Sequence, residues 1–139
     1  MNDIIAELKE QGYKMTPQRR AILRTLLEGE KFINVQSILE NVRSTHPDVG
    51  LDTIYRNLRV LMGIGYVSQI NNPGREGTVY ELNVNKQHHH HSICLSCGKV
   101  ECLSYCPVHN DQLKKIVSDG FHVVSHMLEI YGYCKDCEQ

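Results

Sequence analysis

Two cysteine pairs in the second half of the chain constrain its fold more than any other feature. Each pair is separated by two residues, and the pairs are Cys94 with Cys97 and Cys134 with Cys137. Thiolates at this spacing can reach one ion through a tight turn, and two such pairs complete the closed four-thiolate shell of a structural zinc site. We therefore predict that the second half of this chain is built around a Zn²⁺ ion.

Other uses of these cysteines fit the sequence less well. Disulfides would require an oxidising compartment, and the sequence shows no signal peptide and no apolar run long enough to cross a membrane. A thioredoxin-like redox pair would lie at the strand-to-helix turn of a βαβ unit, and neither pair is expected there. We expect a cytoplasmic protein with no membrane partner.

The metal-binding residue types are concentrated at one end of the chain. All six cysteines and seven of the eight histidines lie from His88 onward. At 139 residues the chain can form one domain of ordinary size or two small ones, which a metal would help to stabilise. We predict two domains, 1–83 and 84–139, that meet in a short polar stretch.

The first 63 residues carry the helical periodicity and the end signals of four helices. The first helix ends at Gly12, and the second begins at Thr16 as N-cap with a proline in its first position. The third is expected to begin at an Asn34 cap and to end before Pro47, and the fourth to begin at an Asp52 cap.

Two strand-like segments, 66–70 and 78–82, follow the fourth helix and predict a hairpin with a basic tip. This order of elements is typical of a winged helix-turn-helix, whose fourth helix here would enter the major groove of DNA. The helical period places the polar residues of this helix on an outward arc. They are Thr53, Tyr55, Arg56 and Arg59.

Local charge supports this interpretation although overall charge does not. The formal net charge is −1 at pH 7, which by itself gives no support to nucleic-acid binding. However, Lys14 and Arg19 lie in a stretch from 12 to 27 without an acidic residue. An ordinary solvated helix face remains the alternative for Arg56 and Arg59.

Four consecutive histidines, 88–91, precede the first cysteine pair. An extended chain sends alternate side chains to opposite faces, so His88 and His90 would point one way and His89 and His91 the other. We therefore predict two further metal sites, each needing ligands from elsewhere in the fold. Cys102 lies close enough to be such a ligand, and the Cys106-Pro107 pair is at most a weak signal for haem.

Three segments together resemble the ferric uptake regulator (Fur) family: LDTIYRNL at 51–58, HHHHSICLSCGK at 88–99 and HMLEIYGYCKDC at 126–137. The resemblance covers nearly the whole chain. It implies an α+β fold with an N-terminal winged helix-turn-helix and a small C-terminal α/β dimerisation domain holding the four-cysteine zinc. It further implies a homodimeric, metal-dependent repressor that binds A/T-rich inverted repeats in double-stranded DNA upstream of metal-uptake genes.

The resemblance also implies roles for single residues. Cys94, Cys97, Cys134 and Cys137 match the structural zinc ligands of the family. Tyr55 and Arg56 match DNA contacts of the recognition helix, and Lys14 and Arg19 match positions near the sugar-phosphate backbone or minor groove. His88, His90 and His126 match ligands of a metal site in the dimerisation domain, where His109 takes the place of the usual glutamate. An all-imidazole site would favour zinc, nickel or cobalt.

His89 and His91 match two ligands of the family's regulatory site between the domains. The remaining ligands stay open among Asn83, Glu81, Glu101 and Cys102. A histidine of the iron and peroxide sensors is replaced here by Phe32 or Ile33, which counts against those subclasses. The histidine run and the Cys106-Pro107 pair are most similar to the zinc uptake regulator branch. Zn²⁺ is therefore expected as the regulatory ion, with Fe²⁺, Mn²⁺ and Ni²⁺ as alternatives.

Two other functional classes account for less of the sequence. A hydrolytic zinc enzyme needs an open coordination position beside a poised acid or base, and none of the usual motifs for one occurs. A zinc-ribbon adaptor that binds only other proteins would leave the predicted winged helix and the histidine run unexplained. We therefore expect a regulator and not an enzyme.

Overall fold

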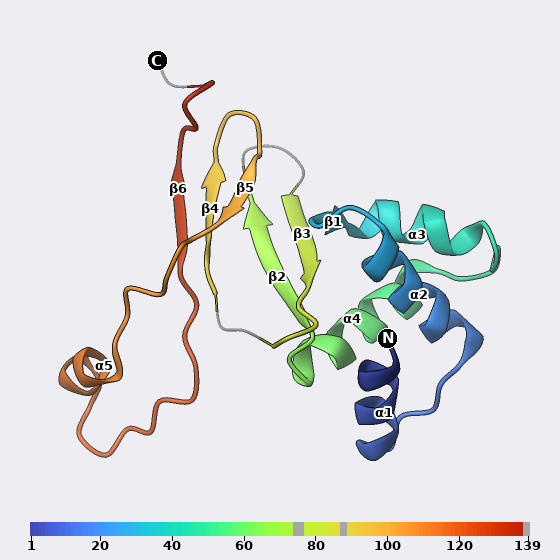
Figure 1. The fold of residues 1–139 in the computed structure, drawn as a ribbon, viewed down its shortest axis with the longest axis horizontal. Helices are drawn as coiled ribbons and strands as arrows, with labels where there is room; N and C mark the ends of the chain where they lie inside the picture. The colour runs from blue at the N-terminus through green and yellow to red at the C-terminus, as the bar shows by residue number, and fades with distance from the viewer. Residues whose placement is uncertain (74–76, 87–88, 138–139) are drawn as a thin grey trace.

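The computed structural model describes residues 1–73, 77–86 and 89–137. The N-terminal helices and a first sheet form one side of the molecule, and a second sheet with long connections and the last helix forms the other (Figure 1). In chain order the elements are α1 (Asn2–Glu10), α2 (Pro17–Glu28), β1 (Ile33–Asn34), α3 (Val35–Arg43), α4 (Leu51–Gly63), β2 (Val67–Asn72), β3 (Gly77–Leu82), β4 (His91–Cys94), β5 (Val100–Cys102), α5 (Asn110–Ile116) and β6 (Glu129–Gly132).

The predicted helix ends are confirmed at three positions and wrong at one. The Thr16 and Asn34 side chains cap α2 and α3 by accepting hydrogen bonds from the third helical backbone N–H, and Gly12 after α1 has a φ of +90°. Helix α4 begins two residues earlier than the Asp52 cap would place it, with Gly50 as N-cap. Asp52 instead lies in the first turn, where its negative charge interacts favourably with the positive N-terminal end of the helix dipole and stabilises the helix.

Helices α1 to α4 enclose the main hydrophobic core together with one sheet. Its fully buried side chains include Ile22, Leu23, Ile38, Ile54 and Leu58. Burial of each such side chain stabilises the fold by about 1.5–3 kcal/mol. The sheet has the order β1-β3-β2, and β2 and β3 form the predicted antiparallel hairpin. The short strand β1 was not predicted, because two residues are too few to show alternation.

The second sheet has the order β5-β4-β6, with β5 antiparallel and β6 parallel to the central strand. Helix α5 buries none of its residues. Residues 121–133 form a strand only near their end, in β6. This half of the molecule contributes few buried apolar side chains, chiefly Ile93 and Cys94.

The two sheets contact each other through a small second core. Ile70 and Val79 of the hairpin pack with Ile93 of β4, and each of these side chains is fully buried. The Asn72 side chain donates a hydrogen bond of 2.8 Å to the Gly98 carbonyl oxygen, between the first cysteine pair and the hairpin. The hairpin is therefore held against the sheet that carries the predicted metal ligands.

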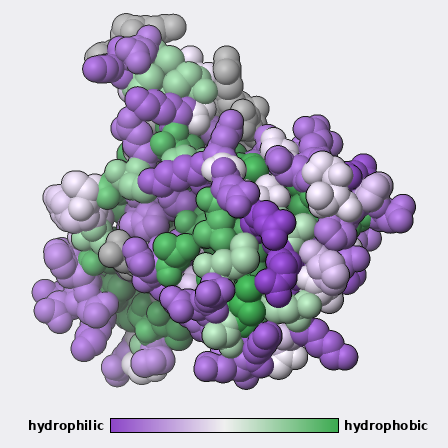
Figure 2. Space-filling model, turned by 45° about the vertical axis from the view of Figure 1, so that its right-hand side comes forward, coloured by the Kyte–Doolittle hydropathy of each residue, from purple (hydrophilic) through white to green (hydrophobic). Residues whose placement is uncertain are grey.

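No described helix is both long enough and apolar enough to cross a lipid bilayer. On the face that shows the helical side, hydrophilic residues cover most of the surface, with hydrophobic residues gathered near its centre (Figure 2).

Candidate metal centres and nucleic-acid interface

The four paired cysteines form one cluster, in which the four Sγ atoms lie within 4.8 Å of one another. Cys94 ends β4 and Cys97 lies in the turn between β4 and β5, whereas the second pair follows β6. Residues Cys94 and Gly132 are paired in the parallel ladder, which brings the end of β6 beside the first turn. The Cys97 and Cys134 Sγ atoms are 3.8 Å apart. Tetrahedral bonds of about 2.3 Å to one zinc ion place two sulfurs about 3.8 Å apart, so the donors fit this ion.

Thiol acidity differs within this cluster. Hydrogen bonds from the backbone N–H groups of Cys97 and Cys134, at 3.5 and 3.4 Å from Sγ, lower the pKa of Cys94 to about 6. The pKa of Cys137 is raised to about 11, because the lowering effect of a hydrogen bond with Ser96 is outweighed by neighbouring thiols and burial. A metal ion requires all four as thiolates, so its binding releases protons.

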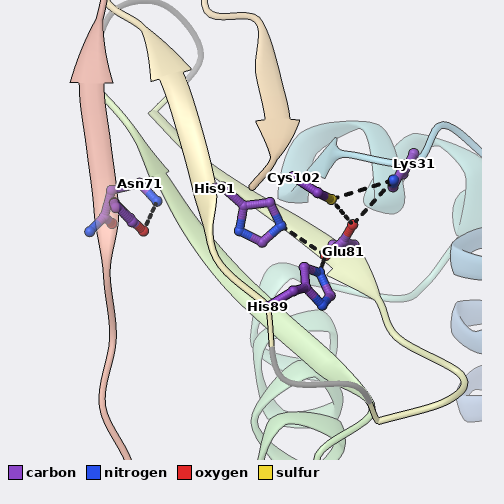
Figure 3. Close-up of polar contacts among 7 residues, drawn as sticks. Lys31, Asn71, Glu81, His89, His91 and Cys102 are labelled. Carbon is purple, nitrogen blue, oxygen red and sulfur yellow. Dashed lines mark hydrogen bonds and ion pairs between the residues drawn. The ribbon is translucent and has the colours of Figure 1, made fainter. Parts of the chain in front are cut away.

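A second cluster comprises Glu81, His89, His91 and Cys102, again with donor atoms within 4.8 Å of one another. Strand register explains how it forms. His91 and Cys102 are directly paired across the β4–β5 ladder, which puts their side chains on one face. His89 lies two residues before His91 and returns to that face. Glu81 reaches the same point from β3 of the hairpin, as Figure 3 shows.

Glu81 is the centre of this second cluster. Its Oε1 lies 2.6 Å from His89 Nε2 and 3.1 Å from His91 Nε2, and its Oε2 lies 3.8 Å from Cys102 Sγ. Burial raises the pKa of this carboxyl. The hydrogen bonds and charges of His91 and His89 lower it by more, so the net shift of the pKa is downward. The side chain is only 3% exposed. A buried carboxylate, two imidazoles and one thiol thus meet at one point, between the hairpin and the second sheet.

Two of the residues left open for this site are placed outside it. Glu101 points to the opposite face of β5 from Cys102. It is exposed there, and its Oε1 atom pairs with Lys99 Nζ at 2.9 Å. Asn83 lines the hollow beside the cluster without being one of its four donors. The Phe32 and His91 rings are perpendicular to each other, with 5.7 Å between their centroids, so an apolar side chain packs beside this histidine.

A third cluster contains His90, Cys106 and His126. The His126 Nε2 atom lies 3.1 Å from His90 Nε2 and 3.3 Å from Cys106 Sγ. The family resemblance implies His109 as a ligand of this site, but His109 is the N-cap of α5 and belongs to none of the clusters among the described residues. Cys106 takes that place, so the donors are mixed nitrogen and sulfur. His88, also assigned here, lies outside the described residues.

The predicted DNA-contacting residues of α4 form an exposed surface. Tyr55, Arg56 and Arg59 are exposed and Thr53 is half-buried, while Ile54 and Leu58 of the same helix are fully buried. One hollow separates this surface from the hairpin, and another separates it from the start of α2. The helix is therefore a ridge with basic side chains, which is a shape that can enter a groove.

Arg19 and Lys14 differ in how freely they can contact DNA. The Arg19 guanidinium donates hydrogen bonds of 2.6 Å to the Asn57 side chain and to the Lys14 carbonyl oxygen. It also lies over the Tyr13 ring, 5.4 Å from its centroid. Arg19 therefore fixes the start of α2 against α4, whereas the Lys14 side chain is exposed.

A band of apolar side chains on the second half of the molecule has no cover. Its members follow or belong to α5 and β6, and all are exposed. They are Ile116, Phe121, Val124, Met127, Ile130, Tyr131 and Tyr133. Strand β6 is also an edge of its sheet. Exposed apolar groups beside a free strand edge mark a surface for protein association.

Comparisons with known proteins agree with this architecture. The chain is 34% identical to the peroxide-responsive repressor PerR of Staphylococcus epidermidis over 140 residues, covering all of this chain and 91% of the relative. The Helicobacter pylori ferric uptake regulator has a similar fold, with a TM-score of 0.72, 24% identity and coverage of 99% of this chain and 91% of that one. A zinc uptake regulator solved with zinc and DNA gives a TM-score of 0.70 at 22% identity, covering 97% and 93%.

A family model matches residues 10–131, which span all but the ends of the chain. That family comprises regulators of transcription and not enzymes. The four-cysteine cluster and the fold expected from the sequence are both present. The chain therefore belongs to the ferric uptake regulator family of metal-responsive regulators.

Proposed function

We propose that this protein is a zinc-sensing repressor that acts as a homodimer on A/T-rich inverted repeats near metal-uptake genes. The observation that carries the proposal is the second cluster. Glu81 belongs to the hairpin of the helical half, whereas His89, His91 and Cys102 belong to the second sheet. We call these four residues the regulatory cluster. Its donors join the proposed DNA-binding half to the proposed dimerisation half.

The donor types of the regulatory cluster favour zinc. One thiol, two imidazoles and one carboxylate are all common zinc ligands, and four of them complete a tetrahedral shell. Manganese prefers oxygen donors, of which this cluster offers only the Glu81 carboxylate. The phenyl ring of Phe32 beside His91 adds no further donor for an ion that needs higher coordination.

A divalent ion at the regulatory cluster would supply the positive charge that lets carboxylate, imidazole and thiolate share one point. Glu81 lies near the end of β3, and β3 pairs with both other strands of the helical half's sheet. Holding Glu81 against His91 and Cys102 therefore fixes the hairpin, and with it α4, relative to the second sheet. Metal raises DNA affinity only as far as it prefers this arrangement over others.

The metal preference is tested by operator mobility shifts on chelator-treated protein that retains its structural zinc. Addition of zinc is expected to restore binding at lower free concentration than ferrous iron, manganese or nickel. Because the 34% identical relative is named as peroxide-responsive, each sample is also exposed to hydrogen peroxide. If ferrous iron restores operator binding and hydrogen peroxide then abolishes it, the result would support a peroxide sensor and contradict zinc sensing.

Replacing Arg56 by alanine is expected to weaken operator binding by about 10- to 100-fold, or about 1–3 kcal/mol, and to relax discrimination against unrelated DNA. The reason is that Arg56 is exposed on the outer arc of α4, where it can reach base edges. Competition mobility shifts at fixed salt measure both quantities.

Two variants serve as references for that result. Lys14→Ala is expected to weaken operator and unrelated DNA alike and to lower the salt slope by about one, as a phosphate contact does. Lys114→Ala removes the same charge from exposed α5 and is expected to change neither. Unchanged specificity in Arg56→Ala at matched salt would remove α4 from its role in base recognition.

The exposed apolar band is the proposed contact surface for a second copy of the chain. Val124→Glu combined with Met127→Glu is expected to convert the protein to a monomer, because both side chains are more than three-quarters exposed and would be covered only by a partner. Sedimentation velocity measures the assembly state. Val84→Glu, at an exposed site near the hairpin, is the control and should leave the dimer intact. A dimer that survives the double change would place the interface elsewhere.

A further inference from the structure

Lys31 brings a fixed positive charge to the regulatory cluster. Its Nζ lies 3.8 Å from Glu81 Oε2 and 3.6 Å from Cys102 Sγ. Lys31 belongs to the loop between α2 and β1, so it reaches the cluster from the helical half (Figure 3). Its side chain is 65% exposed, and its ammonium also lies 5.4 Å from the centroid of the Phe32 ring.

We propose that Lys31 sets the zinc concentration at which the regulatory cluster fills, acting as a tethered cation that competes with the metal for Glu81 and Cys102. This inference rests on the proposed function of the cluster. It assigns a role to a residue that is not itself a ligand. Neither sequence spacing nor the resemblance to the family pointed to Lys31.

The competition follows from the division of acceptors within the cluster. The two imidazoles approach Glu81 Oε1, and the ammonium approaches Oε2 and the thiol sulfur. A divalent ion that takes the thiolate and the carboxylate must therefore share these atoms with a positive charge or displace it. Repulsion between unit and double charges about 5 Å apart, screened as in water, corresponds to somewhat more than tenfold in affinity.

An opposite effect of Lys31 is weaker. In general, a nearby ammonium favours the ionised form of an acidic donor, which would help a metal to bind. However, a coordinating metal ion deprotonates a thiol by its own, larger charge. The net expectation is that Lys31 weakens zinc binding.

The test is a metal titration of the full chain with three substitutions. Lys31→Met removes the charge and keeps an unbranched chain, and Lys31→Arg keeps the charge. Lys99→Met removes a lysine that pairs with Glu101 on β5 and contacts no donor of the cluster. All are made in a Cys106→Ser background, with zinc retained at the four-cysteine cluster. Cobalt is the first probe, because in this background its sulfur charge-transfer absorption reports ligation by Cys102. In a second titration, a chromophoric chelator competes with the protein for zinc.

Lys31→Met is expected to bind cobalt and zinc about tenfold more tightly than the reference. It should also reach half-maximal operator binding at about one tenth of the free zinc. Lys31→Arg and Lys99→Met should stay within about twofold of the reference. Equal or weaker metal binding in Lys31→Met, with the reference binding normally, would overturn the role of Lys31 alone. If the reference shows no charge-transfer band, or if the band persists in Cys102→Ser, the regulatory cluster itself is wrong and this inference falls with it.

Discussion

Replacing His89 and His91 together by alanine is expected to abolish zinc-dependent operator binding while leaving the structural zinc in place. The two imidazoles approach the same Glu81 oxygen at 2.6 and 3.1 Å, so their loss removes half of the donors of the regulatory cluster. The zinc-induced gain in operator affinity, about 5- to 150-fold for a typical allosteric coupling, should disappear. Mobility shifts with and without added zinc measure this gain.

A matched control removes two histidines that lie outside every cluster of the described residues. His109→Ala with His122→Ala deletes the same groups from exposed positions, and its response to zinc should equal that of the wild type. A normal zinc response in the His89 and His91 double variant would place the switch elsewhere. The His90, Cys106 and His126 cluster would then be the next candidate.

Replacing Cys134 and Cys137 by serine is expected to unfold the second half of the chain and to abolish dimer formation and operator binding. The parallel pairing of β4 with β6 extends over only four residue pairs, and α5 buries no residue. A metal ion held by the four-cysteine cluster would therefore supply much of the stability here, since structural zinc sites contribute about 10 kcal/mol or more in small domains. Thermal melting and hydrogen exchange of the β4 and β6 amides measure the loss.

The comparison variant for this prediction is Cys102→Ser with Cys106→Ser. It removes two cysteines that do not belong to the four-cysteine cluster, so the structural zinc and the melting temperature should be retained. If the Cys134 and Cys137 variant melts like the wild type, the four thiolates are not the main stabilising element of this half.

Local rules explain which features could be predicted from the sequence. Helix caps at Thr16 and Asn34 depend on contacts within three residues, and the structure confirms both. The alternation of an extended chain separates His90 from His89 and His91, and the structure places them in different clusters. The paired cysteines need only two tight turns and one parallel strand contact to meet.

Features that depend on distant contacts could not be predicted in the same way. Strand register places Glu81 and Cys102 beside His89 and His91, and leaves Asn83 and Glu101 outside that cluster. A single sequence does not show this register. Cys106 reaches His126 through long connections without regular structure, whereas His109, which matched by resemblance, became a helix cap. The register of β5 and the course of the chain after β5 therefore determine which residues join the second and third clusters.

The most direct test of the account measures bound zinc and operator affinity on the same samples, over a series of buffered free zinc concentrations. Wild-type protein is compared with the His89 and His91 double variant. Wild-type operator affinity is expected to rise over the zinc range in which the protein binds the one equivalent per chain that the variant lacks. Full operator affinity in wild-type protein before that equivalent binds would contradict the regulatory role of the Glu81, His89, His91 and Cys102 cluster.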